Sequence, residues 1–200
     1  MKMLAQRDPL TGLFNRRFTW DYLEQHQTSV CARTALLAIF LIDVDHFKAI
    51  NDTYGHSAGD EVLRQISRAL EIAVPPTGLV GRYGGEEFIV ILHGIAAGDL
   101  HCAGEALRHA VAELSPELLE GSPKVTVSIG AAHLEENESF VEGLKRADRA
   151  LYAAKNGGRN KVMEHEDAHR HGFDGQTRTA QAPQSTEPMS IESTTSSVTI

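Results

Sequence analysis

The chain has 200 residues and a formal net charge of −8, and 42% of its residues are hydrophobic. This length and composition predict one globular domain with appendages, and the acidic charge argues against a nucleic-acid partner, because phosphate-backbone binding needs a basic face. The longest apolar run, residues 35–42, is shorter than the ~20 residues that cross a bilayer, and no signal peptide is recognisable at the start. We therefore expect a cytoplasmic protein with no membrane contact.

The first predicted strand ends in acidic residues. Residues 35–43 form a continuous apolar run of the kind that is buried on both faces of a sheet. Strand alternation then sends Asp43 and Asp45 to one face and Val44 to the other. Residues 60–74 follow with an apolar stripe at helical spacing, which predicts an amphipathic helix.

A Gly-Gly pair interrupts the next β-rich region. The runs at residues 79–83 and 88–92 bracket Gly84 and Gly85. This pattern predicts a tight hairpin, in which both glycines take positive φ in the turn. Two acidic residues, Glu86 and Glu87, follow immediately.

The remaining elements continue the alternation of helix and strand. We predict a helix over residues 100–114, a strand over 124–132 and a second amphipathic helix over 139–155, with Ser139 as its N-cap and Gly157-Gly158 as its stop. The order helix, strand, helix, hairpin, helix, strand, helix, strand predicts an α+β domain with a mixed sheet.

The composition changes near residue 164. Residues 164–200 are rich in Ser and Thr, and no apolar period organises them, so we predict a disordered tail behind a folded domain of residues 1–163. The tail contains a His-Glu-x-x-His pattern at residues 165–169, which is also the zinc-peptidase signature. Because no apolar stripe flanks it, we interpret this match as chance.

The acids of the strand end and of the hairpin suggest a cation site. Oxygen ligands such as Asp43, Glu86 and Glu87 suit Mg²⁺, which usually binds one or two carboxylates together with substrate phosphates. Gly84 and Gly85 would let a bulky ligand approach the backbone closely. Taken alone, each acidic pair is equally compatible with a solvated strand end or an exposed hairpin.

Four segments together resemble the motifs of the GGDEF-domain diguanylate cyclase family. They are DPLTGLFNRR at residues 8–17, DVDHFKAINDTYGH at 43–56 with Gly59-Asp60 after it, GGEEF at 84–88, and ADRALYAAKNGGRN at 147–160. Their order and spacing match the family over roughly residues 8–163. The resemblance implies a fold like that of the nucleotidyl cyclases and polymerase palms. It also implies that two GTP are condensed into cyclic di-GMP.

The resemblance also implies a metal site. In the family, the positions of Asp43 and Glu86 hold two divalent ions, with help from the Val44 carbonyl and with Glu87 nearby. Mg²⁺ is the expected ion and Mn²⁺ is possible; such ions neutralise charge on the phosphates. Glu86 is further implied as a candidate general base for the attacking 3′-hydroxyl.

Substrate-binding positions follow from the same motifs. The residues implied to bind GTP are Asn51 and Asp60 at the guanine, Lys48, Lys155 and Arg159 at the phosphates, Gly84 and Gly85 at the turn, and His56 in the pocket. An Asp can accept hydrogen bonds from guanine N1–H and its 2-amino group. For His56, a plain hydrogen-bonding role is equally compatible with the sequence. We interpret Asp45 and Asp52 as structural, either as caps or as partners that orient Lys48 and the loop.

The resemblance implies one GTP per domain, so catalysis requires a homodimer with facing sites. Only seven residues precede Asp8, whereas relatives usually carry a dimerising segment there. We therefore expect either a fragment, or a chain that dimerises by weak self-association or with help from another protein. Residues 75–78 lack the Arg-x-x-Asp inhibition motif of many relatives, which predicts no product inhibition through that site. The alternative function is a catalytically silent GTP-binding or interaction module.

Overall fold

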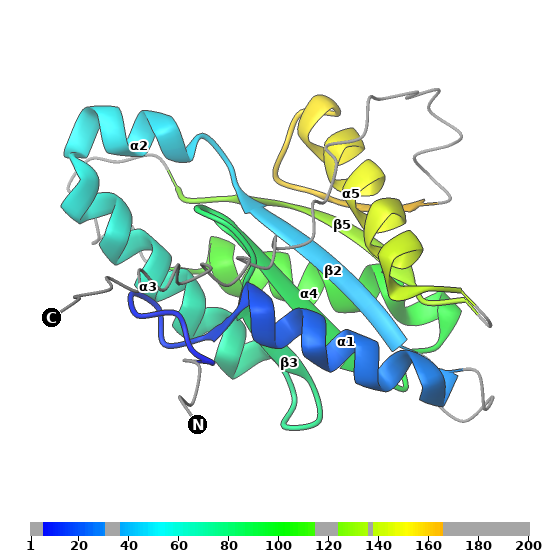
Figure 1. Ribbon diagram of the computed structural model, residues 1–200. Coiled ribbons are helices and arrows are strands. Elements are labelled where there is room, and N and C mark those ends of the chain that lie inside the picture. The colour runs from blue at the N-terminus through cyan, green and yellow to red at the C-terminus, as the bar shows by residue number, and fades with distance from the viewer. Residues whose placement is uncertain (1–5, 31–36, 115–123, 136–137, 166–200) are drawn as a thin grey trace, which may run out of the picture.

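The computed structural model describes residues 6–30, 37–114, 124–135 and 138–165. Figure 1 shows a central sheet with helices on both of its faces. The strands are β1 (Phe14–Asn15), β2 (Leu37–Val44), β3 (Leu79–Arg82), β4 (Glu87–His93), β5 (Val127–His133) and β6 (Val162–Glu164). The helices are α1 (Arg16–Val30), α2 (Phe47–Tyr54), α3 (His56–Ala73), the short 3-10 helix η1 (Ala97–Asp99), α4 (Leu100–Ala112) and α5 (Phe140–Asn156).

The six strands form one mixed sheet in the order β1-β3-β4-β2-β5-β6. β2 lies between β4 and β5 and pairs antiparallel with both, whereas the β1–β3 and β5–β6 pairs are parallel. All eight residues of β2 are buried, as its continuous apolar run predicted. The mixed α+β fold expected from the sequence is confirmed.

Two apolar clusters, one on each face, hold the sheet between its helices. Phe40 and Ile42 belong to the cluster that includes the apolar side chains of α3 and α4. Ile39 and Leu41 belong to the cluster that includes Leu23 of α1 and the apolar side chains of α5. Full burial of one such side chain contributes about 1.5–3 kcal/mol. These two clusters fix β2, and therefore the acids at its end, relative to both helical layers.

One predicted helix boundary is confirmed and another is corrected. Ser139 caps α5, because its side chain accepts a hydrogen bond from the Glu142 N–H. α3, however, begins at His56 and not at residue 60, because Gly55 separates it from α2 with a φ of 85°. A left-handed φ of this kind is readily adopted only by glycine.

The hairpin between β3 and β4 forms, but the prediction of its turn was wrong. Neither Gly84 nor Gly85 has a positive φ. Four residues connect the strands, and the N–H groups of Tyr83 and Gly84 both donate to the Glu87 carbonyl, at 2.8 and 3.1 Å. Two-residue turns require left-handed backbone, and this longer turn does not. At Gly84 the space matters instead, because a Cβ there would lie 2.4 Å from Glu87 Oε2.

The predicted tail lies almost entirely outside the described residues, as do Cys31 and most of the His-Glu-x-x-His pattern. The domain boundary at residue 164, where β6 ends, therefore stays a prediction. Within the described ranges, no helix combines the length and the apolar character needed to span a membrane. The cytoplasmic location also stays a prediction.

Candidate functional site

The acids of the strand end and of the hairpin come together. In the β2–β4 register, Asp43 lies opposite Glu87. One residue further, the Val44 N–H donates to the Glu86 carbonyl at 3.3 Å. Val44 belongs to the core cluster with α3, while Asp43 contacts α5 on the other face, so the predicted alternation is confirmed. The hairpin thus places both glutamates beside the end of β2.

Asp43 is a buried carboxylate with one cationic neighbour. Only 5% of it is exposed, and Lys155 Nζ lies 2.6 Å from its Oδ2. Burial raises the pKa of Asp43; the ammonium of Lys155 opposes this shift, and the nearby carboxylates of Glu87 and Asp45 add to it. The local charge balance at this strand end therefore favours additional positive charge.

Lys155 reaches Asp43 because α5 packs unusually close to the sheet. A Cβ built on Gly130 of β5 would lie 2.1 Å from the Ala147 carbonyl oxygen of α5, so only glycine permits this contact. The resemblance assigned Lys155 to the substrate phosphates, whereas in the structure its amine is paired with Asp43. Its role toward phosphate stays a prediction.

The residues at this strand end fit a divalent cation that shares its ligands with a substrate. Across the described part of the chain, no three His, Cys, Asp or Glu side chains form a complete metal-binding group. The neighbouring carboxylates of Asp43 and Glu87 form a partial set of oxygen ligands, and the backbone of Glu86 lies beside the end of β2. Mg²⁺ is commonly held by one or two carboxylates and completed by substrate phosphates and water. Such a set therefore suits Mg²⁺ better than a metal that needs a full protein cage.

The predicted guanine-binding residues lie together where α2 meets α3. A Cβ on Gly59 would lie 2.0 Å from Asn51 Oδ1, so the Asn51 side chain rests directly against the backbone of α3. Asp60 is the next residue of α3, so both predicted base-binding residues belong to the region where α2 meets α3. Lys48 on α2 and His56 at the start of α3 are exposed. No described contact assigns either of them a structural partner.

The loop after α5 has a left-handed backbone over three successive residues. The φ angles of Gly158, Arg159 and Asn160 are 103°, 60° and 45°. The N–H groups of Gly157 and Arg159 donate to carbonyls of α5, at 2.8 and 3.1 Å. These two N–H groups are therefore already bonded within the chain, while the Arg159 side chain is exposed.

Asp45 has a structural role, but not with the partners that the sequence suggested. Its carboxylate accepts hydrogen bonds from Ser128 Oγ at 2.6 Å and Thr126 Oγ1 at 2.7 Å. A third comes from the Asn160 N–H at 3.0 Å. No described contact links it to Lys48. Asp45 instead connects β5 to the loop that carries Arg159.

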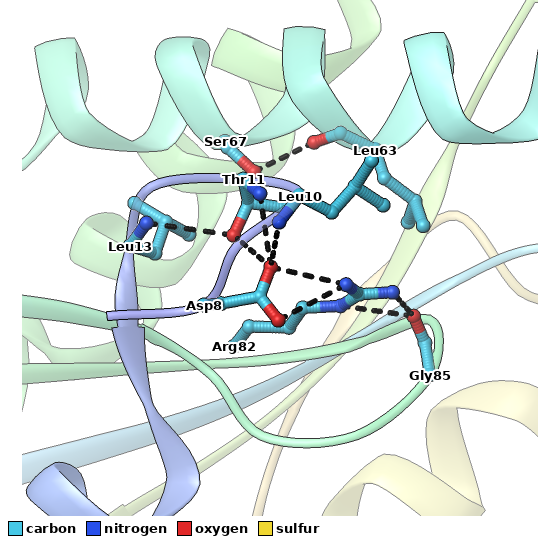
Figure 2. A network of polar contacts seen from close by, with 8 residues as sticks. All are labelled: Asp8, Leu10, Thr11, Leu13, Leu63, Ser67, Arg82 and Gly85. Atoms are coloured by element: carbon cyan, nitrogen blue, oxygen red, sulfur yellow. Dashed lines mark hydrogen bonds and ion pairs between the residues drawn. The ribbon is translucent and has the colours of Figure 1, made fainter. Parts of the chain in front are cut away.

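Sequence reasoning left Arg82 unassigned, and the structure gives it a bracing position (Figure 2). Its guanidinium NH1 donates to both carboxylate oxygens of Asp8, at 3.0 and 3.2 Å. Its Nε and NH2 donate to the Gly85 carbonyl, at 3.2 and 2.7 Å. Arg82 therefore ties the hairpin turn to the N-terminal segment.

Asp8 is the second half of this brace. Its Oδ1 also accepts hydrogen bonds from the Leu10 N–H and from the N–H and hydroxyl of Thr11. Burial works to raise the pKa of Asp8, but the Thr11 hydrogen bonds and the Arg82 guanidinium together hold it below its usual value. The motif at residues 8–17 was the only signal in the sequence that this segment belongs to the site.

Comparison with known proteins agrees with this geometry. Residues 5–161 match the family described as "Diguanylate cyclase, GGDEF domain". Diguanylate cyclase DgcM of Escherichia coli K12 is 46% identical over 159 residues, which cover 80% of this chain and 38% of DgcM. The probable diguanylate cyclase DgcC of the same strain is 39% identical over 166 residues, covering 81% of this chain and 44% of DgcC. The chain thus spans less than half the length of these relatives.

Solved structures show the same fold. The GGDEF domain of DgcB from Caulobacter crescentus, in complex with c-di-GMP, superposes with a TM-score of 0.76 at 35% identity, covering 83% of this chain and 99% of that domain. The active GGEEF domain of a diguanylate cyclase from Vibrio cholerae has a TM-score of 0.71 at 31% identity, covering 76% and 97%. The motifs, the fold and these matches agree: the chain belongs to the GGDEF-domain diguanylate cyclase family.

Proposed function

We propose that this chain condenses two GTP into cyclic di-GMP and releases two pyrophosphates, as a diguanylate cyclase domain. The observation that carries the proposal is the pairing of Asp43 with Glu87 across β2 and β4, with Glu86 joined to Val44 beside them. This partial set of carboxylates suits metal-bound phosphates. The contact of Asn51 with Gly59, next to Asp60, supplies a second group of polar side chains that suits a base.

Each residue has a distinct task in this proposal. Asp60 and Asn51 hold the guanine edge, and Asp60 favours guanine because it accepts hydrogen bonds from two N–H donors. Lys48 and Arg159 approach the triphosphate, and Lys155 moves between Asp43 and a phosphate oxygen. When bound, Mg²⁺ or Mn²⁺ neutralises charge on the phosphates and on the leaving pyrophosphate.

The bond-forming step joins two copies of the chain. The 3′-oxygen of one GTP attacks the α-phosphorus of the GTP held by the partner, and the bond to pyrophosphate breaks. The Glu86 carboxylate is the proposed acceptor for the 3′-hydroxyl proton. One domain holds one GTP, so a homodimer must place the two nucleotides face to face, and positioning supplies much of the rate.

The test is a concentration series of the purified chain with GTP and Mg²⁺, in which cyclic di-GMP is quantified by chromatography. We expect product to rise more steeply than linearly with protein concentration, and Glu86→Ala to abolish it. Glu24→Ala, an exposed change on α1, is the matched control and should retain full activity.

Two outcomes would count against the proposal. Linear dependence on protein would contradict the dimer requirement, and product formation by Glu86→Ala at the original rate would remove Glu86 from the mechanism. GTP binding without product would indicate either a silent binding module or a domain that lacks its dimerising segment. A coiled coil fused ahead of the chain separates these two, because only the second becomes active.

A further inference from the structure

A strained segment lies next to the predicted phosphate-binding residue Arg159. Arg159 and Asn160 have φ angles of 60° and 45°, and neither is glycine. Residues with side chains rarely adopt this left-handed conformation, and they keep it only where the surrounding contacts fix it. Two contacts of Asn160, one from the sheet and one from α4, fix this backbone.

The first contact comes from the central strand of the sheet. The Asn160 N–H donates to Asp45 Oδ2 at 3.0 Å, and Asp45 follows directly after β2. The carboxylate is itself immobilised, because the hydroxyls of Ser128 and Thr126 donate to it and only 5% of the residue is exposed. A carboxylate buried to this degree needs such donors. Asp45 thus holds the loop at Asn160 in a fixed position relative to the sheet.

The second contact comes from α4. Asn160 Oδ1 accepts a hydrogen bond from Arg108 NH1 at 2.8 Å. Arg108 is in turn fixed by Glu105, whose carboxylate accepts from its Nε and NH2. Asn160 is therefore held from the sheet through its backbone and from a helix through its side chain.

Arg159 has no comparable anchor. Its side chain is exposed and has no hydrogen-bond or ion-pair partner among the residues described. The direction in which its guanidinium leaves the chain is consequently set by the backbone at Arg159 and Asn160. A contact that fixes this backbone therefore also fixes the direction of the Arg159 side chain.

We propose that Asp45 is a positioning residue, which fixes the left-handed turn at Arg159 and Asn160 and so directs the Arg159 guanidinium toward the triphosphate of the substrate. The inference rests on the proposed function, since it takes GTP as the ligand of Arg159. If Asp45 only stabilised the fold, its substitution would weaken the binding of a triphosphate nucleotide and of GMP to the same extent.

The first arm of the test needs no ligand. Hydrogen exchange of the Asn160 amide is measured by NMR in the wild-type chain, Asp45→Asn and Asp45→Ala. We expect protection in the wild type, faster exchange in Asp45→Asn and the fastest in Asp45→Ala, which offers no acceptor. Should Asp45→Ala fail to fold, Asp45→Asn carries the test. Ser128→Ala removes one donor to Asp45 but keeps the Asn160 contact, so its Asn160 amide should stay protected.

The second arm measures binding by calorimetry, with Mg²⁺ and either α,β-methylene-GTP or GMP. We expect Asp45→Asn to weaken binding of the triphosphate analogue by about tenfold, the scale of one charged hydrogen bond, and to change GMP binding by less than about twofold. In the double variant Asp45→Asn/Arg159→Ala, the analogue should bind as it does to Arg159→Ala alone. Residues that act through one another give such non-additive effects.

The possible failures are distinguishable. A wild-type Asn160 amide that exchanges freely, equal losses for GMP and the analogue, or additive losses in the double variant would each overturn the role of Asp45. If the wild-type chain bound both nucleotides and Asp45→Asn bound them equally well, this inference alone would fail. A wild-type chain that bound neither nucleotide would overturn the proposed function and this inference together.

Discussion

The two carboxylates at the end of β2 have different partners: Asp43 contacts a cation, and Asp45 accepts hydrogen bonds from neutral donors. Asp43 and Asp45 are two positions apart and each is 5% exposed. On the hairpin side, Asp43 contacts Lys155 and has the carboxylate of Glu87 nearby, and burial raises its pKa. On the β5 side, Asp45 accepts hydrogen bonds from Ser128, Thr126 and Asn160.

In the proposed function, this difference distinguishes Asp43, whose carboxylate serves a ligand, from Asp45, whose carboxylate is satisfied within the fold. Burial of an ionised carboxylate is costly unless donors or cations compensate it. Three neutral donors satisfy Asp45 within the protein. Around Asp43 the carboxylates outnumber the cation in contact with it, so folding leaves a demand for positive charge. The metal-bound triphosphate of the proposed function would meet that demand.

Of the substitutions considered, we expect Asp43→Asn to have the largest effect on catalytic activity. Asp43→Asn should lower the rate of cyclic di-GMP formation at least ~1,000-fold, about 4 kcal/mol, because the substitution removes the charge that holds the metal-bound phosphates. The measurement is product per unit time at saturating GTP and Mg²⁺. Asp21→Asn, an exposed change on α1, is the control and should retain activity. Comparable losses in both variants would contradict the assignment.

For the stability of the fold, we expect the substitution of Asp45 to have a larger effect than the substitution of Asp43. Asp45→Ala should lower the free energy of unfolding by about 2–3 kcal/mol, because it leaves the buried hydroxyl of Ser128 and the partly buried donors of Thr126 and Asn160 without an acceptor. Asp43→Ala should cost less, since it removes a carboxylate whose charge is poorly compensated. Urea unfolding followed by circular dichroism measures both. A larger loss for Asp43→Ala would break the comparison.

A third prediction uses pH to examine the ion pair that braces the hairpin. The pKa of Asp8 is lowered in the folded chain, so the stability that it contributes is complete above its ordinary value of 3.8 and is lost as the pH falls through the lower folded pKa. Asp8→Asn should therefore cost about 1 kcal/mol at neutral pH, a modest loss because solvent screens this partly exposed pair.

Urea unfolding of the wild type and Asp8→Asn between pH 2 and 7 tests this prediction. The difference between them should shrink toward zero at the acid end. A difference that stays constant with pH would show that the Asp8 charge has no part in the brace.

The smallest effect on activity is expected at Gly59, where the substitution changes the space beside Asn51 and leaves the charge unchanged. Gly59→Ala places a methyl group against Asn51, whose Oδ1 lies 2.0 Å from the ideal Cβ position. The Asn51 side chain must move away, so the KM for GTP should rise by about fivefold, the loss of a modest hydrogen bond. Gly98→Ala has open space around its Cβ and serves as the control. Unchanged steady-state kinetics in Gly59→Ala would show that Asn51 does not contact the base.

Local sequence patterns predicted much of the architecture. The apolar run before Asp43 predicted a strand buried on both faces, and alternation correctly separated Asp43 from Val44. Ser139 was correctly identified as a cap. Such features depend on side chains a few residues apart, so the linear sequence contains the necessary information. The turn at Gly84 and Gly85 was predicted wrongly, because the same glycine pair suits a close contact as well as a left-handed turn.

What the sequence by itself determined was the family, the mixed fold and the set of residues that could hold metal and nucleotide. Only the tertiary structure identified the donors that bind Asp45, because Ser128 lies 83 residues away in the sequence and reaches it through the β2–β5 register. The structure also revealed Arg82 as the partner of Asp8, 74 residues away. Hydrogen bonds between distant segments depend on strand order and helix packing, and no local pattern specifies them.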